Sequence, residues 1–458
     1  MRNDKESPFT LHLAATGEQW PVTRFKGGEG LNQLYRFEIQ LIDAAVDIDA
    51  LHNSEAYLSL GEQHGIHGLL ASVSLEYRHP RQQVCHLVLM PRLQQLHTPR
   101  KRRALSAMTV PQILQHLLES NGLSEDHYRI ELDEARYPLR PFCIQYEESD
   151  LQLLQRLCEE EGIHYHFSHR PDGHVLVLAD DALNFDPQPL TTPFHCGTAQ
   201  PQTGPVIWAL YQRHGQPLDR LPPFCHDPAP FQDDEHAANQ RLNDARPSIL
   251  HDSHDHLRQC SRRHLERLRA GQAQVYGHST RSELLSSRIV QVEQHPLSRF
   301  NDQWLLIETQ HQFQQTSTTS VYRNQFTAIL WSTPFRPPLK QPRPSIPGYQ
   351  RARVWGVEGQ PAVLDRQGRL PVCLWPDDPG AEDTDLWLPM ALTVAQAFAN
   401  RLPLAGSEVL VSFLDHDPDR PLICGLLEPQ RDSPPTRPDP IDTRLLFDWL
   451  LHDPDINL

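Results

Sequence analysis

The chain of 458 residues is long enough for roughly two to four domains. Its 42 Lys and Arg residues against 58 Asp and Glu give a net charge of -16. That balance disfavours nucleic acid as the main partner, because proteins that wrap a phosphate backbone carry a basic stripe. Glycine is scarce at 22 residues and proline abundant at 41, which excludes collagen and arrays built on a glycine period.

The sequence shows few signals for membrane insertion, export or disulfide formation. No apolar stretch is long enough for a membrane-spanning helix, so we expect no membrane span. Residues 1–8 contain no apolar core of the signal-peptide type, which predicts a chain made in the cytosol and exported, if at all, by another route. The eight cysteines are spread singly with no CxxC pair, a pattern that favours reduced, buried thiols over a disulfide framework.

The N-terminal part reads mostly as β-strands. Residues 34–41 alternate apolar and polar positions, and residues 84–90 form an apolar run. Two helices follow, each opened by a capping box, in which a hydroxyl side chain and a glutamine three residues later satisfy each other's backbone N–H. These boxes are Thr109 with Gln112, opening a helix at 110–120, and Ser149 with Gln152, opening a helix that ends at Gly162.

Further elements are predicted along the rest of the chain. A hairpin is expected at 163–179 around Pro171-Asp172-Gly173, and the Pro-rich stretch 199–235 is expected to be irregular. Helices are predicted at 235–245 and 255–270, strands at 288–292, 303–313 and 322–330, and a compact all-β block at 352–428 with short strands at 369–375, 408–413 and 421–426. The short apolar cluster 445–451 is either a docking segment or a helix packed on its own protein.

No strong catalytic motif is present: the sequence has no GxSxG, HExxH or GxxxxGK[ST] pattern. The 26 histidines nevertheless raise the question of metal binding. His256, Cys260 and His264 recur at i, i+4 and i+8 on a predicted helix, which places them on one side as candidate metal ligands. The same positions, with Leu257 and Leu268, also read as the apolar seam of that helix, and we favour this structural interpretation.

Other titratable groups are expected to face water. His164 and His166 occupy one face of a predicted strand, which we interpret as solvated. The carboxylates Glu147, Glu148 and Glu159–Glu161 lie at helix edges, and nothing in the sequence indicates the burial that acid–base catalysis needs. The residues alone therefore indicate a mostly β, multi-domain assembly or binding protein without visible catalytic machinery.

Two blocks of residues resemble a known family. The first runs from Arg140 to Tyr165 and includes Phe142, Tyr146, Ser149, Asp150, Leu151 and Gly162. The second lies near the C-terminus and includes Gly368, Arg369, Pro403, Gly406, Val409, Asp417, Pro418, Asp419, Arg420, Pro421 and Gly425. Both are similar to the valine-glycine repeat protein G (VgrG) family, the spike hub of type VI secretion systems, and the resemblance covers roughly residues 9–428.

The resemblance implies a mainly β (α+β) fold. It would consist of two phage-tail-hub-like β-barrel domains with inserted helices, followed by a small OB-fold barrel. The corresponding segments are a first hub β-barrel domain at 9–105, a helix-containing hub segment with a β-hairpin at 106–200, a second hub β domain at 201–332, a Pro-rich linker at 333–350, an OB-fold neck at 351–428, and a Pro/Asp-rich tail with a short apolar segment at 429–458.

The resemblance also implies a structural role without catalysis or cofactor. The protein would be a homotrimer that contacts the Hcp tube protein and baseplate components, with residues 429–458 as a possible site for an effector or adaptor. It would assemble in the cytoplasm of the producing bacterium and leave through the apparatus. The family normally continues into a C-terminal β-helix rich in Val/Gly repeats, which this sequence lacks, so we expect a short form.

Three alternatives stay open at this stage. One is an accessory or degenerate VgrG-like adaptor that recruits an effector. Another is a metal-dependent hydrolase that uses the histidine cluster. A nucleic-acid-binding OB-fold is the third, and the acidic turn 415–419 argues against it.

Overall fold

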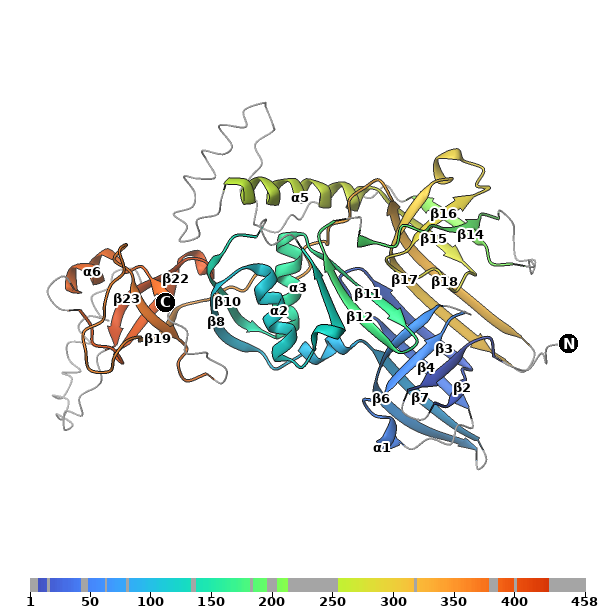
Figure 1. Ribbon diagram of the computed structural model, residues 1–458, viewed down its shortest axis with the longest axis horizontal. Helices are drawn as coiled ribbons and strands as arrows, with labels where there is room; N and C mark the ends of the chain where they lie inside the picture. The colour runs from blue at the N-terminus through green and yellow to red at the C-terminus, as the bar shows by residue number, and fades with distance from the viewer. Residues whose placement is uncertain are drawn as a thin grey trace, which may run out of the picture.

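The computed structural model describes most of the chain. Its described residues are 7–14, 17–42, 48–61, 64–79, 82–132, 137–181, 184–195, 204–212, 254–316, 319–378, 386–398 and 402–427. They form an elongated molecule with a large curled sheet at one end, a helical module in the middle and a small barrel at the other end (Figure 1). We call these parts the head, the module and the barrel. The predicted helix at 235–245 and the apolar cluster 445–451 lie outside the described residues.

The head is one sheet of thirteen described strands. Eleven follow the order β14-β15-β18-β17-β3-β4-β7-β6-β5-β1-β2, and β13 and β16 branch from β17. Their bounds are β1 Thr10–Leu13, β2 Gln19–Pro21, β3 Arg24–Gly30, β4 Arg36–Ile42, β5 Glu55–Ser59, β6 Gly65–His79, β7 Gln82–Met90, β13 Leu190–Pro193, β14 Ile207–Gln212, β15 Gln274–Ser279, β16 Ile289–Glu293, β17 Gln303–Gln315 and β18 Ser320–Leu330. A short helix, α1 (Ile48–Leu51), precedes β5.

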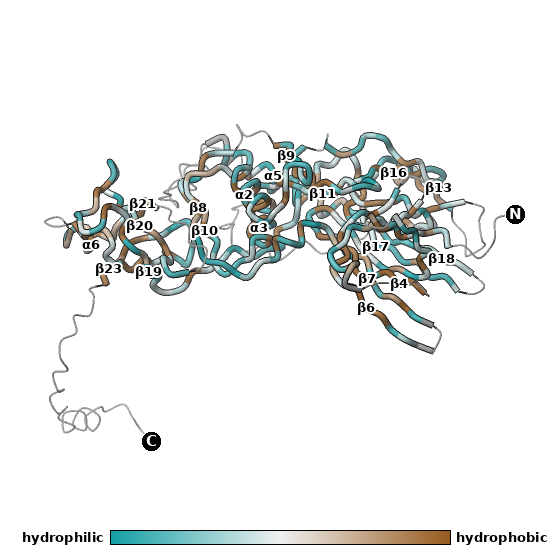
Figure 2. Tube along the Cα trace, turned by 60° about the horizontal axis from the view of Figure 1, so that its bottom comes forward, coloured by the Kyte–Doolittle hydropathy of each residue, from teal (hydrophilic) through white to brown (hydrophobic). Residues whose placement is uncertain are grey.

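Strands from distant parts of the sequence join this sheet. β17 pairs antiparallel with β3, with Phe313 opposite Phe25. Phe313 then packs edge-on against Phe9 at a ring distance of 4.6 Å, so it belongs to the core of the N-terminal strands. Apolar and polar residues alternate along the long strands, as the hydropathy colours show (Figure 2), because one face is buried and the other is not. The predicted strands at 34–41, 84–90, 288–292, 303–313 and 322–330 are confirmed within a few residues.

The module contains both capped helices. β8 (Lys101–Met108) and β10 (Arg140–Glu148) form a ribbon, and β9 (Tyr128–Glu131), β11 (His164–Arg170) and β12 (Gly173–Ala179) form a second small sheet. The helices are α2 (Val110–Ser120) and α3 (Asp150–Glu161), with short 3-10 turns at η1 (Arg92–Leu96) and η2 (Glu125–His127). Both predicted capping boxes are present, and Gly162 ends α3 in the left-handed conformation at φ 69°.

Helix α5 (His254–Gln272) lies along the module (Figure 1). Among the side chains of α5 that the structure describes, the buried ones are His256, Arg263 and Ala270, spaced by seven residues. The predicted apolar seam is therefore wrong at Cys260, His264 and Leu268, which are only half-buried, and the buried face includes an arginine.

The barrel is a five-stranded antiparallel sheet. Its strands are β19 (Tyr349–Val354), β20 (Leu370–Leu374), β21 (Leu386–Leu388), β22 (Glu408–Phe413) and β23 (Pro421–Leu427), and helix α6 (Leu392–Phe398) lies between β21 and β22. The order in the sheet is β21-β20-β19-β22-β23. A parallel bridge joins Met390, just after β21, to Ile423 in β23, and so brings the two edges of the sheet together. This pairing curls the sheet toward closure; the OB-fold and the domain boundaries given above stay predictions. No described helix is long and apolar enough to cross a membrane.

Candidate functional site at the ends of helix α3

Helix α3 begins directly after a β-bulge in strand β10. The register of β10 against β8 shifts between Tyr146 and Glu148, and Glu147 adopts a positive φ of 52°, as a β-bulge requires. The Ser149 Oγ then accepts a hydrogen bond from the Gln152 N–H at 3.2 Å, and the Gln152 Oε1 accepts one from the Ser149 N–H at 2.9 Å. The bend points the next side chain, Asp150, into the module.

Asp150 is fully buried and links three surrounding elements. Its carboxylate accepts hydrogen bonds from Lys101 Nζ at 2.7 Å, Arg103 Nη2 at 3.1 Å, Asn121 Nδ2 at 2.9 Å and Gln145 Nε2 at 3.0 Å. Burial alone would raise the pKa of Asp150, but these donors outweigh it and lower the pKa. The aspartate therefore stays ionised and holds β8, β10 and α2 to the start of α3.

Three carboxylates that were expected to face water are buried instead. Glu148, Glu159 and Glu161 expose 7%, 5% and 2% of their surface. Each carboxylate has cationic or N–H donors that compensate for the lost water. Arg156, for example, grips both oxygens of Glu148 at 2.8 and 2.9 Å. The prediction of solvated edges was wrong for these residues because their partners lie on other segments.

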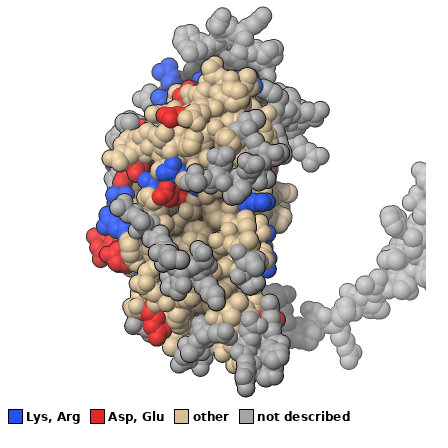
Figure 3. All heavy atoms as spheres, turned by 90° about the vertical axis from the view of Figure 1, so that its right-hand side faces the viewer, with Lys and Arg blue, Asp and Glu red and all other residues tan. Residues whose placement is uncertain are grey.

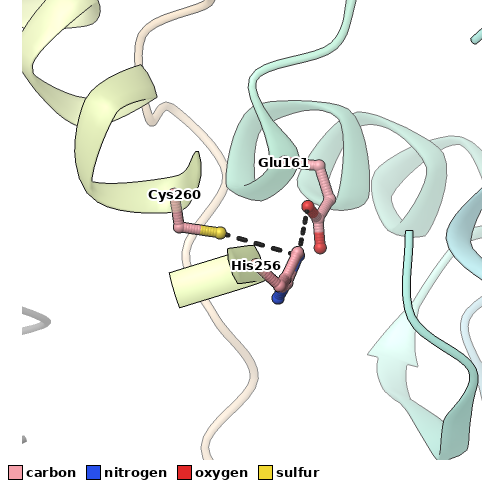
Figure 4. A group of neighbouring side chains, drawn as sticks. All are labelled: Glu161, His256 and Cys260. Carbon is pink, nitrogen blue, oxygen red and sulfur yellow. Dashed lines mark hydrogen bonds and ion pairs between the residues drawn. The ribbon is translucent and has the colours of Figure 1, made fainter. Parts of the chain in front are cut away.

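At the C-terminal end of α3, Glu161 meets two candidate metal ligands (Figure 4). The His256 Nε2 lies 2.9 Å from Glu161 Oε2, and the Cys260 Sγ lies 3.6 Å from the same nitrogen. Arg140 Nη2 donates to the other oxygen, Oε1, at 2.6 Å. Burial would raise the pKa of Glu161, but His256 and Arg140 hold it at about 2, so the carboxylate is ionised at neutral pH.

The arrangement argues against nucleophilic catalysis. In a thiol–imidazole–carboxylate relay, the nucleophile and the orienting acid occupy opposite ring nitrogens. Here Cys260 and Glu161 both face Nε2 of His256. His264, the third candidate from the sequence, is not part of the cluster, and Glu161 takes its place.

Arg263 fixes helix α5 beside this cluster. Its guanidinium is buried and contacts Asp180 Oδ2 at 2.7 Å and the Tyr137 hydroxyl at 3.2 Å, and it donates to the Glu161 carbonyl at 2.5 Å. Burial raises the pKa of Tyr137, which stays protonated. The sequence analysis missed Arg263 because it counted only apolar positions, although the seven-residue spacing from His256 marks the same helix face.

The linker between β18 and β19 is fixed to α3. The Glu159 Oε2 accepts hydrogen bonds from the backbone N–H groups of Lys340 and Gln341, both at 2.7 Å. Arg336 Nη1 donates to the carbonyls of Gly162 at 3.1 Å and Asp180 at 2.6 Å. The linker is thus held along the end of α3 before it reaches the barrel.

The other end of the linker is held by the barrel. Arg343 pairs with Asp417 at 3.3 Å and with Asp419, both in the turn before β23. This turn, Asp417–Pro421, is one of the segments that resemble the family, and its role here is to receive the linker.

The β8–β10 ribbon also contacts the barrel directly. The Tyr146 ring lies 5.6 Å from the Trp375 ring, and Phe142 and Ile144 are buried in the barrel's own apolar cluster. We call the ribbon, the linker and the Asp417–Pro421 turn together the joint. Of the N-terminal signature residues, Phe142 and Tyr146 thus serve the joint.

The remaining C-terminal signature residues shape the barrel. Gly368 and Gly406 have φ values of 74° and 88°, which a side chain would strain, and both lie in turns. Arg369 closes the first turn through Asp365, whose carboxylate accepts from the Arg369 N–H at 2.8 Å and from its Nε at 2.6 Å. Val409 is buried in the barrel core, the Pro403 carbonyl accepts from the Ala362 N–H at 2.8 Å, and Gly425 lies in β23.

His164 and His166 are buried, not solvated as predicted. The His164 ring stacks on His166 and on Phe185, at 4.6 Å from the latter, and the His166 ring lies tilted against Phe185 at 5.3 Å. Burial lowers the pKa of His166 to about 4 and the pKa of His164 well below its usual value. Both imidazoles are therefore neutral at pH 7.

Seen from the broad end of the head, the described surface shows neither a large basic patch nor a large acidic patch (Figure 3). Basic and acidic side chains occur there in small mixed groups among uncharged residues. On the barrel, by contrast, two adjacent loops expose apolar side chains, namely Trp355, Val357, Val363 and Leu404. We call these four residues the barrel patch; exposed apolar residues that gather on neighbouring loops are typical of interfaces.

Comparison with known proteins places these features in context. Residues 28–214 and 224–317 match the family described as phage tail baseplate hub (GPD), a structural component rather than an enzyme. Two curated relatives from Pseudomonas aeruginosa are similar: the type VI secretion system spike protein VgrG4b, 34% identical over 92% of this chain and 56% of its own length, and the spike protein VgrG5, 33% identical over 96% of this chain and 60% of its own. The chain thus spans less than two thirds of these relatives.

A solved structure shares the fold. It is the E. coli c3393 protein, described as a component of the type VI secretion system with structural similarity to the T4 bacteriophage tail proteins gp27 and gp5. The TM-score is 0.68 at 24% identity, over 91% of this chain and 99% of that chain.

The buried histidines predict a pH dependence of stability. The unfolded His166 takes up a proton below about pH 6.5, whereas the folded one does so only near pH 4. Lowering the pH through this window therefore favours unfolding, by on the order of 3 kcal/mol for this residue. In urea unfolding at about pH 7.5 and about pH 4, His166→Phe should lose less stability on acidification than the wild type. The exposed His52→Gln is the control, and an equal pH dependence in wild type and His166→Phe would refute the assignment.

The linker contacts predict protection from proteolysis. Glu159→Ala removes both side-chain hydrogen bonds to the linker, so the exposed Lys340 should be cut by a lysine-specific protease about tenfold faster or more, yielding fragment 341–458. Gel electrophoresis of a digestion time course measures the rate. Glu125→Ala, on an exposed turn of the same module, should digest like the wild type. Equal rates for Glu159→Ala and wild type would show that the linker is held by other contacts.

Proposed function

The chain belongs to the phage tail baseplate hub (GPD) family, and on that premise we propose that it is the hub of a type VI secretion spike. In this role it connects the tube and the baseplate to the part that enters the target cell. The joint is the observation that carries the proposal, because a hub must pass force from its broad end to its narrow end. The joint couples head, module and barrel through half-buried ion pairs, hydrogen bonds to the linker backbone and ring contacts.

The ion pairs around α3, next to the joint, would resist such a force. Removing one partner of a buried, hydrogen-bonded ion pair costs about 3–5 kcal/mol, because the other charge is left without compensation. Asp150, Glu148 and Glu161 lie at the two ends of α3, and each of them pairs with a lysine or an arginine. Displacing α3 from its surroundings would break several of these contacts together.

The protein acts as a homotrimer in this proposal. The barrel patch supports it, since Val357 and Val363 expose 66% and 72% of their surface in one chain. Three barrels around a common axis would bury these side chains, and closed cyclic symmetry would prevent open-ended association. The broad end of the head, with its mixed charges, would receive the Hcp tube protein, and baseplate components would surround it.

Assembly takes place in the cytoplasm of the producing bacterium, and firing of the apparatus carries the protein outward. Residues 429–458, which lie outside the described residues, are the proposed site for an effector or adaptor. The names of the relatives, both spike proteins, support the spike role over that of an accessory adaptor. The hydrolase alternative is not favoured, because the matched family is described as a tail baseplate hub.

Light scattering after size-exclusion chromatography tests the trimer. At micromolar concentration the wild-type chain should show three times its mass of 52.6 kDa. Val357→Asp combined with Val363→Asp should shift the protein to monomer, because the carboxylates would be buried without partners. The control is Tyr77→Ser, which changes a similarly exposed side chain of the head and should leave the trimer intact. A monomeric wild type would overturn the trimer, and a trimeric double variant would overturn the role of the barrel patch.

A further inference from the structure

We propose that Glu161, His256 and Cys260 bind a divalent transition-metal ion, with zinc as the first candidate. The site is independent of the hub role and would clamp the start of α5 onto the end of α3. It is made by residues 95 positions apart in sequence, so it can form only in the folded chain.

The ligand atoms converge on one point. In a tetrahedral zinc site, bonds of about 2.0–2.2 Å to nitrogen and oxygen and about 2.3 Å to sulfur put neighbouring ligand atoms about 3.3–3.6 Å apart. Here Sγ of Cys260 is 3.6 Å from Nε2 of His256, Nε2 is 2.9 Å from Oε2 of Glu161, and all three atoms lie within 4.8 Å of one another. The nitrogen–sulfur distance already fits an ion, the nitrogen–oxygen distance must open by about half an ångström, and a water molecule would complete the four ligands.

The local structure presents these atoms together. His256 and Cys260 are four residues apart in α5 and so lie on the same face, one turn apart. Glu161 is the last residue of α3, and Gly162 turns the chain away immediately after it. The feature that rules out a catalytic relay, two groups facing the same ring nitrogen, is the feature that a metal site requires.

Two arginines orient the carboxylate, and Arg263 Nη1 stays 3.7 Å from Oε2, which is beyond hydrogen-bond distance. Arg140 binds Oε1 of Glu161 at 2.6 Å and leaves Oε2 directed at His256, and Arg263 holds the Glu161 carbonyl at 2.5 Å. Metal-binding carboxylates and imidazoles are typically held by such outer hydrogen bonds, whose loss weakens metal affinity by about 10–100-fold.

The charges around the site also balance. A Glu161 carboxylate and a Cys260 thiolate neutralise a divalent ion. The two nearby guanidinium groups also contact Glu161, Arg140 at 2.6 Å and Arg263 at 3.7 Å. Each has a second anionic neighbour, Glu160 at 4.0 Å for Arg140 and Asp180 at 2.7 Å for Arg263. The charges of the ion and its two anionic ligands therefore sum to zero.

Binding exchanges a proton for a metal–sulfur bond. The Cys260 thiol loses its proton to solvent, and Nε2 of His256 must be unprotonated to donate its lone pair to the ion. Affinity should therefore fall as the pH is lowered, as for other thiolate and imidazole sites.

Cobalt(II) titration of the full chain, stripped of metal by a chelator, tests the proposal. Cobalt occupies zinc sites and shows a thiolate-to-metal charge-transfer band only when sulfur is bound. The wild type should take up one equivalent per chain with this band, and one equivalent of zinc should displace it. Cys260→Ser should abolish the band, and Glu161→Gln should weaken binding by about tenfold or more.

Two matched variants act as controls. His264→Asn, on the same helix but outside the cluster, and Cys424→Ser, a half-buried thiol in the barrel, should bind cobalt like the wild type. Circular dichroism of each metal-free variant checks its fold. A wild type without the charge-transfer band, or a band that survives Cys260→Ser, would overturn the proposal. Light scattering of the same samples reports the trimer separately, so failure of one proposal is distinguishable from failure of the other.

Discussion

The burial of carboxylates at the two ends of helix α3 is the constraint on which the rest of the structure depends. Asp150 and Glu148 at its start and Glu159 and Glu161 at its end are removed from water, so each must find donors on neighbouring segments. Those donors come from β8, β10, α2, α5 and the linker. Satisfying the charges at the ends of one short helix therefore sets the positions of five other elements, and through the linker it positions the barrel.

This constraint explains how a mostly β protein becomes a single mechanical unit. The β3–β17 pairing joins the two halves of the head into one sheet. The α3 contacts attach the module and the linker to it, and the Tyr146–Trp375 contact together with Arg343 attaches the barrel. The proposed spike hub would need this continuity, because a hub transmits position and force between its ends.

Local signals in the sequence predicted local structure well. The Thr109–Gln112 and Ser149–Gln152 boxes and the stop at Gly162 depend on residues within one turn, and all are present. Long-range consequences could not be read in the same way. The burial of Glu161 depends on His256 and Arg140, the stacking of His164 depends on Phe185, and the β3–β17 register joins strands from opposite ends of the head. Charged and aromatic residues look alike in a sequence whether they face water or a distant partner, so their burial emerged only from the fold.

The central claim is that the chain works as one jointed unit within a threefold hub. A cryo-electron microscopy reconstruction of the purified full chain tests it most directly. The account predicts a threefold particle in which the barrels surround the axis, the patch formed by Trp355, Val357, Val363 and Leu404 is buried between copies, and each barrel meets its own module at Tyr146 and Trp375. A particle without threefold symmetry, or barrels placed at variable angles to their heads, would contradict it.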